Sequence, residues 1–292
     1  ALHDGEHAEV AEALREQYLP RFAGDELPAT CSGMAVSIAD KLDTIAGIYA
    51  TGQKPSGTRD PFGLRRAALG LLRTSIERGL ELDLQQLLAQ AVAAARTDME
   101  SVAVAQGRSL APVDLGQLRD EVYDYVIERL RAYYVDGVAG IVVTPEMFDA
   151  VLVTRPASPL DFDARLRALV QFLQLPDAGS LAAANKRIAN ILRKTDEAVG
   201  ETVDPQRLID PAEQILAEQV VAIARQVEPR FASRDYTAGL QQLAVLRKAV
   251  DDFFDSVMVM TDDAALRSNR LALLNRMRGL FMRVADLSRL PG

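Results

Sequence analysis

The chain has 292 residues, a formal net charge of −8 and 49% apolar residues, with no tryptophan and one cysteine. Its length suits two ordinary domains or one large helical one, and the apolar fraction is ample for a core. The lone Cys31 excludes a disulfide framework and a cysteine-rich zinc site. The lone cysteine also favours a reducing cytoplasm. No apolar run approaches the length of a membrane span, so we expect a soluble protein without a membrane partner. The sequence starts without methionine or a signal peptide, so we also expect a portion of a longer chain.

The acidic charge is concentrated in the first part of the chain. Residues 1–180 contain 17 basic and 26 acidic side chains, whereas residues 181–292 contain 16 and 15. From residue 264 onward there are six arginines and one aspartate. An acidic protein with such a basic segment can still bind a polyanion, with affinity that depends strongly on salt.

The first 180 residues read as a succession of helices separated by proline and glycine breaks. Apolar spacing predicts helices over residues 6–19, 33–50, 83–106, 113–134 and 161–173. Asp60 followed by Pro61 predicts another helix start, as does Thr144 followed by Pro145. Residues 141–143 are the only β-like run and are too short to indicate a sheet. Asp40 lies among apolar neighbours, so we expect it to be partly buried and paired.

The segment after Asp60 combines small residues with arginines. Gly63, Ala67 and Gly70 recur at steps of four and three, which predicts a narrow helix edge that a neighbour approaches closely. The arginines at 65, 66 and 73 flank that edge. Two interpretations stay open: a solvated basic face on a tightly packed helix, or a surface that faces phosphates.

From residue 181 the pattern is helix after helix, typical of an antiparallel bundle with short loops. The predicted helices cover residues 181–199, 211–227, 236–260 and 264–290. In the last one the apolar stripe has arginines 276 and 283 on one flank and arginines 267, 278 and 289 on the other. Arg270 points into the stripe, so we interpret it as buried and expect Asp252 or Asp255 as its partner.

One motif suggests metal chemistry. His3-Asp4, with Asp40 downstream, resembles the HD-superfamily phosphohydrolases, in which two histidines and two aspartates hold a metal. The resemblance is partial because an earlier histidine is lacking, so we expect no metal and regard His3, Asp4 and Asp40 as relict candidates. An HD-type metal-dependent phosphohydrolase is the alternative function. The absence of histidine after His7 and of a glycine-rich phosphate loop argues against a self-contained enzyme.

Three stretches of the bundle carry a more specific resemblance: NKRIANIL (185–192), FFDSVMVM (253–260) and LRSNRLALL (266–274). They are similar to the DALR-type helical anticodon-binding domain of several aminoacyl-tRNA synthetases. With YLPRFAGDELP (18–28), IADKLDT (38–44) and DPFGLRRAALG (60–70), the chain resembles the C-terminal portion of the beta subunit of bacterial glycyl-tRNA synthetases. The resemblance runs through nearly the whole chain in colinear order.

The resemblance implies an all-α fold: an HD-like helical domain over residues 1–105, a helical connector over 106–180, and an anticodon-binding bundle over 181–292. It also implies a heterotetramer of two alpha and two beta chains that attaches glycine to tRNA-Gly using ATP. In that enzyme the aminoacylation site is on the alpha subunit, so the partners of this chain would be tRNA-Gly, the alpha subunit and a second beta subunit. We expect no catalytic residue and no cofactor in this portion. A purely structural scaffold for the alpha chain is a further alternative.

Anticodon bases are unstacked in their loop, so asparagine and arginine can read their edges while basic side chains hold the phosphates. Helix-to-helix hydrogen bonding within the bundle is an equally open interpretation for Asn185 and Asn269. The candidate tRNA-binding residues are Asn185, Lys186, Arg187, Asn190, Lys194, Arg267, Asn269, Arg276, Arg283, Arg65 and Arg66.

Overall fold

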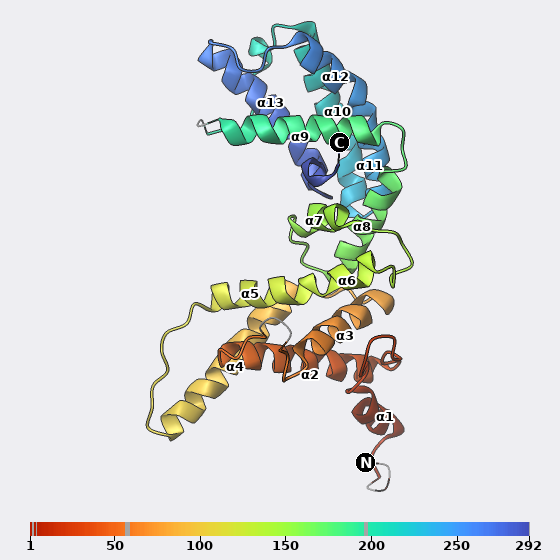
Figure 1. Ribbon diagram of the computed structural model, residues 1–292, viewed down its shortest axis with the longest axis vertical. Coiled ribbons are helices and arrows are strands. Elements are labelled where there is room, and N and C mark those ends of the chain that lie inside the picture. Colours follow the sequence, from red (N-terminus) through yellow and green to blue (C-terminus); the bar gives the residue numbers. More distant parts are fainter. Residues whose placement is uncertain (2, 4, 56–58, 196–197, 292) are drawn as a thin grey trace. The chain divides into compact units, whose positions relative to one another are not determined.

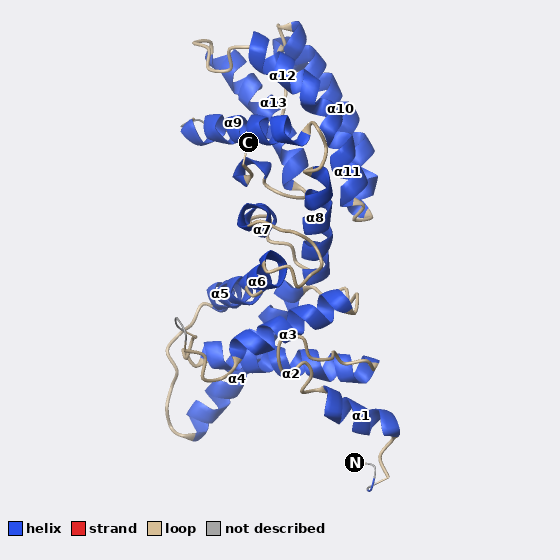
Figure 2. Cartoon of the chain, turned by 45° about the vertical axis from the view of Figure 1, so that its right-hand side comes forward, coloured by secondary structure: helices blue, strands red, loops and turns tan. Residues whose placement is uncertain are grey.

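The computed structural model describes residues 1, 3, 5–55, 59–195 and 198–291, and every regular element in those ranges is a helix (Figure 2). The predicted all-α class is confirmed. Residues 1–139 and 157–161 form one compact unit, and residues 140–156 and 162–292 form a second. Within the described ranges, no helix is both long and apolar enough to cross a membrane. The domain boundaries expected at residues 105 and 180 stay a prediction.

The first unit is organised around one central helix (Figure 1). This helix, α2, packs against α1, α3, α4 and α5. Its inner face carries Ile45 and Ala46, which are fully buried, and α3 contributes Leu64 and Leu72 to the same core. The helices are α1 (Ala8–Glu16), α2 (Cys31–Ala50), α3 (Leu64–Glu77), α4 (Leu84–Ala105), α5 (Leu115–Glu128) and α6 (Leu130–Val135).

A buried carboxylate, that of Glu16, fixes where α2 starts. Glu16 accepts hydrogen bonds from Ala29 N at 2.8 Å and from Thr30 N at 3.1 Å. Thr30 in turn caps α2 by accepting from Gly33 N at 2.9 Å. A methyl group on Gly33 would overlap the Glu16 side chain, so only glycine fits at this approach.

The start of α3 differs from the prediction. The helix begins at Leu64 rather than at Pro61, because Gly63 has φ +68° and turns the chain into the helix. Asp60 still caps it from a distance, accepting from Leu64 N at 2.8 Å and Arg65 N at 2.9 Å. The predicted close approach is found at Gly70. A methyl group there would lie 3.0 Å from the Lys41 side chain and 3.1 Å from Pro20.

The second unit is a bundle in which two long helices make most of the contacts. Helix α10 packs against α11, α12 and α13, while α13 also packs against α9, which crosses it in Figure 1. A short 3₁₀ turn near the C-terminus returns to α7, where Asp286 N donates to Ala150 O at 2.8 Å. The α-helices are α7 (Pro145–Leu152), α8 (Pro159–Phe172), α9 (Ala178–Lys194), α10 (Pro211–Ala232), α11 (Tyr236–Leu243), α12 (Arg247–Ser256) and α13 (Ala264–Met282), with 3₁₀ turns η2 (Pro205–Arg207), η3 (Ala244–Leu246) and η4 (Leu287–Arg289).

Three predicted helices are broken in the structure. Residues 113–134 form α5 and α6. Residues 236–260 form α11, η3 and α12, and the chain becomes extended at Val257, where φ is −109° and ψ is 122°. The closing helix ends at Met282, and Asp286 then caps η4 by accepting from Ser288 N at 3.2 Å. Buried valines at 257 and 259 and the buried Leu287 continue the apolar pattern beyond the helix ends, which explains why periodicity alone extended them.

Candidate nucleic-acid interface

The exposed face of α9 gathers four of the predicted residues. Lys186, Arg187, Asn190 and Lys194 are all exposed, while Leu181 and Ile188 on the opposite side are fully buried. At 100° per residue the four lie within about a quarter turn of the helix axis. They line a hollow of about 430 Å³ along this face. The structure therefore brings this part of the predicted set together.

A ring from a neighbouring helix supports one of these cations. The Arg187 guanidinium lies 4.1 Å from the ring centroid of Phe254, a half-buried residue of α12. The stack holds the guanidinium plane on the surface, where it can attract a phosphate or stack against a base. Phe254 was missing from our predicted set. Nothing in the sequence distinguishes it from Phe253, which is fully buried.

Ion pairing separates the cations of the second unit into two groups. Most of its arginines are bonded to carboxylates: Arg207 to Asp204, Arg230 to Asp235, Arg247 to Asp177 and Asp251, and Arg283 to Glu228. Within the described ranges of that unit, six cations have no carboxylate partner, and four of them are on the same helix. The six are Lys186, Arg187, Arg193, Lys194, Arg225 and Arg276.

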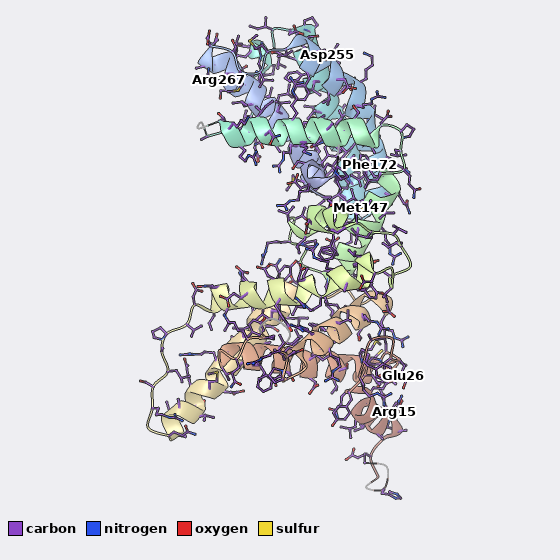
Figure 3. All side chains as sticks on the ribbon, in the orientation of Figure 1. Arg15, Glu26, Met147, Phe172, Asp255 and Arg267 are labelled. Carbon is purple, nitrogen blue, oxygen red and sulfur yellow. The ribbon has the colours of Figure 1, made fainter. Side chains whose placement is uncertain are left out.

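The arginines of α13 are mostly committed to the protein itself. Arg267, near the start of the helix (Figure 3), donates to Thr261 O at 2.7 Å, and Arg278 donates to Asp286 at 2.9 Å. The half-buried Arg276 has no hydrogen bond or ion pair with any described residue. Arg283 forms two bonds with Glu228, the shorter 2.9 Å. Arg276 is therefore the most available member of the predicted α13 set.

Arg270 is half-buried, with a side chain 12% exposed, and the expected partner is wrong. Its guanidinium pairs with Glu213 of α10 and donates to Met258 O at 2.9 Å. Asp252 instead pairs with Lys248 one turn away, and Asp255 (Figure 3) is exposed. The extended chain from Val257 onward lets α13 pack against α10, which brings Glu213 to Arg270.

The asparagines of the predicted set are mostly internal. Asn185 is 1% exposed and donates to Leu181 O at 2.9 Å. Asn269 is 5% exposed, accepts from Asp204 N at 2.7 Å and donates to Asp204 O at 3.1 Å. The Asn185 bond lies within α9 and is not the helix-to-helix bond of the alternative interpretation, whereas the Asn269 bonds join α13 to the residue that caps η2. Asn269 thus pins the segment that enters η2 onto α13. RNA contact by either residue stays a prediction.

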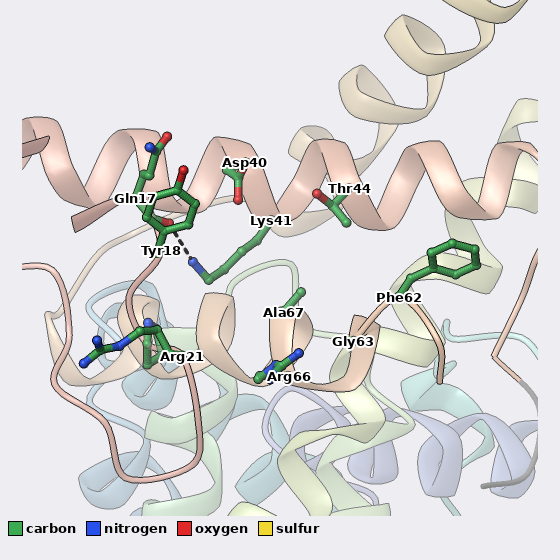
Figure 4. A pocket seen from close by; sticks show the side chains of 11 residues that line it. Gln17, Tyr18, Arg21, Asp40, Lys41, Thr44, Phe62, Gly63, Arg66 and Ala67 are labelled. Carbon is green, nitrogen blue, oxygen red and sulfur yellow. Dashed lines mark hydrogen bonds between the residues drawn. The ribbon is translucent and has the colours of Figure 1, made fainter. Parts of the chain in front are cut away.

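The two candidates of the first unit lie on α3. Arg66 is exposed and Arg65 half-buried, whereas Arg73 is buried and donates to Glu77 at 2.7 Å. Arg73 therefore belongs to the packed side of the helix, and a phosphate-facing role for Arg65 and Arg66 stays a prediction. Arg66 lines a pocket of about 430 Å³ between α2 and α3, to which α2 contributes Asp40 and Thr44 (Figure 4).

Asp40 is exposed in this pocket, so the expectation that it is partly buried is wrong. The buried residue is its neighbour Lys41, which is 6% exposed. Lys41 Nζ donates to Leu19 O at 2.8 Å, to Ser37 Oγ at 2.7 Å and to Gln17 O at 3.2 Å. Burial lowers the pKa of Lys41 to about 8. This ammonium therefore joins α2 to the chain after α1.

The relict metal candidates are not assembled by the described residues. Asp4 lies outside them, and His3 and Asp40 are both exposed. Among the described residues no group of three or more histidine, cysteine, aspartate and glutamate side chains could hold a metal ion. His7 caps α1 by accepting from Glu9 N at 3.3 Å.

Comparison with known proteins assigns both halves of the chain. A family model described as glycyl-tRNA synthetase beta subunit matches residues 1–152, and a model of the DALR anticodon binding domain matches residues 181–287. The glycine–tRNA ligase beta subunit of Marinobacter nauticus is 50% identical over 100% of the chain, and that of Actinobacillus pleuropneumoniae is 49% identical over 99%. A Haemophilus influenzae relative of the same name is 49% identical over 99% of the chain.

The chain spans 39% of the length of each of these relatives. The first family model alone covers residues 1–152, more than half of the chain. The match to the Marinobacter nauticus relative, at 50% identity, covers 292 residues and so both units. The chain therefore belongs to the glycyl-tRNA synthetase beta subunit family.

Proposed function

We propose that this chain recognises the anticodon loop of tRNA-Gly for a glycine–tRNA ligase. The exposed face of α9 carries the proposal, since Lys186, Arg187 and Lys194 line one hollow and have no carboxylate partner among the residues that the structure describes. The stacked Arg187 adds a flat surface for an unstacked base. The helix lies in the segment that matches the DALR anticodon binding domain.

The wider assignment follows from the family and is part of the proposal. The whole enzyme would attach glycine to tRNA using ATP in the cytoplasm, with the aminoacylation site on an alpha subunit. This chain would work within a heterotetramer of two alpha and two beta subunits and would not ligate glycine alone. Arg65 and Arg66 of α3 are proposed as a second, phosphate-facing surface.

Binding of the chain to tRNA-Gly tests the central proposal. We expect binding that weakens when the anticodon is substituted and when Lys186, Arg187 and Lys194 are all replaced by alanine. Each lost phosphate contact removes an electrostatic contribution, so the triple variant should bind at least ten-fold more weakly at moderate salt.

A matched variant controls for net charge. Arg207, Arg230 and Lys248 are exposed cations of the same unit, each paired with an aspartate on its own surface. Replacing these three by alanine makes the same change in net charge and should leave tRNA affinity within about two-fold, because exposed ion pairs contribute little. Equal losses in both triple variants would refute the α9 surface. Binding that ignores the anticodon would favour the scaffold alternative.

A further inference from the structure

The pocket between α2 and α3 is lined by an acidic and a basic side chain that are not paired with each other. Its volume is about 430 Å³, and Figure 4 shows Asp40 and Thr44 on α2 and Arg66 on α3. All the residues that line it belong to the first unit. The pocket therefore shares no residue with the candidate nucleic-acid interface on α9.

Arg66 is the available cation of this pocket. Two other cations line it, but the protein itself engages both. Lys41 Nζ donates to Leu19 O at 2.8 Å. Arg21 Nε donates to Asp25 at 2.9 Å. Arg66, in contrast, is exposed and has no hydrogen bond or ion pair with a described residue. A free guanidinium of this kind is suited to a carboxylate, which it can bind through two parallel hydrogen bonds.

Gly63 leaves room for the Arg66 guanidinium on the α3 side of the pocket. A methyl group on Gly63 would lie 2.7 Å from Nη2 of Arg66, so the guanidinium lies against the backbone where α3 begins. Gly63 also has φ +68°, a conformation that disfavours any side chain. The same glycine thus turns the chain into α3 and makes space for the cation.

Asp40 is the anion on the α2 side. Among the described residues that line the pocket it is the one carboxylate, and it has no hydrogen bond or ion pair with any described residue. Lys41 is near enough to respond to the charge of Asp40, yet its ammonium donates to the carbonyl of Leu19 instead. Thr44, one turn further along α2, has no hydrogen-bond partner in the described part of the chain either. A carboxylate and a hydroxyl side by side suit a ligand ammonium, which has three donors.

Two exposed aromatic rings lie at the ends of the pocket (Figure 4). Tyr18 is 65% exposed at one end, and Phe62 is 43% exposed at the other. Exposed rings at the rim of a pocket offer flat apolar contacts to a ligand. The ligand should therefore carry a flat apolar group beside its two charges.

We propose that this pocket binds a free aromatic α-amino acid. Its carboxylate pairs with Arg66, its ammonium with Asp40 and Thr44, and its ring lies on Phe62. The two charged groups of an amino acid are attached to one carbon, so one small molecule can satisfy both unpaired side chains. A ligand with only a negative charge would be repelled by Asp40, and one with only a positive charge by Arg66. The inference goes beyond the proposed function and does not depend on it.

Three ligands that share a phenyl ring test the two pairings. L-phenylalanine has both charges, 3-phenylpropanoate lacks the ammonium, and phenethylamine lacks the carboxylate. Ligand-detected NMR with the whole chain, read by competition, measures the three dissociation constants. We expect L-phenylalanine to bind about ten-fold more tightly or better than either analogue, because each analogue leaves one charged side chain without its partner. Glycine, which lacks the ring, should bind more weakly than L-phenylalanine.

Two variants remove the pairings one at a time. Asp40→Asn should bring L-phenylalanine and 3-phenylpropanoate to nearly equal affinity, and Arg66→Gln should do the same for L-phenylalanine and phenethylamine. Asp43→Asn and Arg15→Gln are the matched controls, because both side chains are exposed and outside the pocket. They should keep the discrimination of the wild type, and thermal unfolding checks that all four variants fold.

A wild-type chain that does not bind L-phenylalanine, or that binds glycine or either analogue equally well, overturns the inference. An Asp40→Asn variant that still discriminates overturns it as well. The phosphate contact proposed above for Arg66 uses the same guanidinium but not Asp40. Asp40→Asn therefore separates the two ligands, since it should weaken the amino acid and leave tRNA-Gly binding intact. Anticodon recognition by α9 stands or falls independently of these outcomes.

Discussion

The guanidinium of Arg270 is 12% exposed and its partner Glu213 is fully buried. Glu213 also accepts the backbone N–H groups of Ile209 and Asp210 at the start of α10. One carboxylate therefore caps a helix and neutralises a cation from another. Removing the cation would leave a buried charge with only backbone donors, which is costly in a medium of low polarity.

Arg270→Leu should lower the free energy of unfolding by about 3–5 kcal/mol. At temperatures where the variant is folded, its affinity for tRNA-Gly should stay within a few-fold of wild type. Urea unfolding followed by circular dichroism measures the first quantity and filter binding the second. Arg283→Leu is the matched control: its pair with Glu228 is exposed, so the cost should stay below about 1 kcal/mol. A stable Arg270→Leu protein that no longer binds tRNA would contradict the structural role.

For single residues, the sequence predicted some side-chain burial correctly and some incorrectly. Helical periodicity correctly placed Arg270 inside and Lys186 and Lys194 outside. It failed for Asp40, because the adjacent Lys41 takes the buried position and finds carbonyl partners from the chain after α1. Partners distant in sequence, such as Glu213 for Arg270, depend on how helices pack, which one sequence does not specify.

At the scale of the elements, the long helices were predictable and their ends were not. The helix expected over residues 83–106 is Leu84–Ala105, and the one expected over 33–50 is Cys31–Ala50. Helical periodicity did not predict the breaks at η3 and after Met282, because buried apolar residues continue through them. Tertiary packing decides these positions against local preference.

Two glycines within helices differ in the space around them: one is packed closely against a ring and the other faces open space. Gly239 of α11 lies against the Phe231 ring of α10, and a methyl group there would overlap the ring. Gly279 of α13 is exposed, with nothing within 4 Å of a methyl group. Gly239→Ala should therefore destabilise the chain by about 1–3 kcal/mol, since the ring is 5% exposed and must shift. Gly279→Ala should stabilise it by about 0.4–1 kcal/mol through the unfolded state.

Urea unfolding midpoints of the two single variants and the double variant measure both effects. The sites are independent, so the double variant should show the sum of the single changes. A Gly239→Ala protein as stable as wild type would mean that α11 does not pack as closely on α10 as the structure has it.

At the scale of the whole molecule, a net charge of −8 coexists with a proposed polyanion surface. Composition indicated a basic C-terminal segment, yet carboxylates of the protein itself neutralise much of that charge, as in the ion pairs of Arg270, Arg278 and Arg283. The cations without a carboxylate partner among the described residues are instead concentrated on α9. Pairing in three dimensions, which a charge count does not contain, thus selects the candidate surface.

The salt dependence of tRNA binding follows from this selection. Three cations of α9, Lys186, Arg187 and Lys194, have no carboxylate partner in the described part of the chain. Phosphate contacts there should therefore release counterions without first breaking an ion pair. The logarithm of the association constant should fall linearly with the logarithm of salt concentration. In the triple alanine variant the slope should be shallower by about two, at roughly 0.7 per lost phosphate contact to an unpaired strand. Titrations between about 50 and 200 mM salt measure both slopes.

The control for this slope is the triple variant at Arg207, Arg230 and Lys248, whose aspartate partners already neutralise them. Its slope should match that of the wild type, because these cations contact the protein and not the RNA. Exposed cations that merely steer the encounter would change the association rate and leave the equilibrium slope intact. The wild type and both triple variants could instead show equal slopes, with a lower association constant only for the α9 variant. That result would mean that stacking on Arg187, and not phosphate contacts, is the main source of affinity.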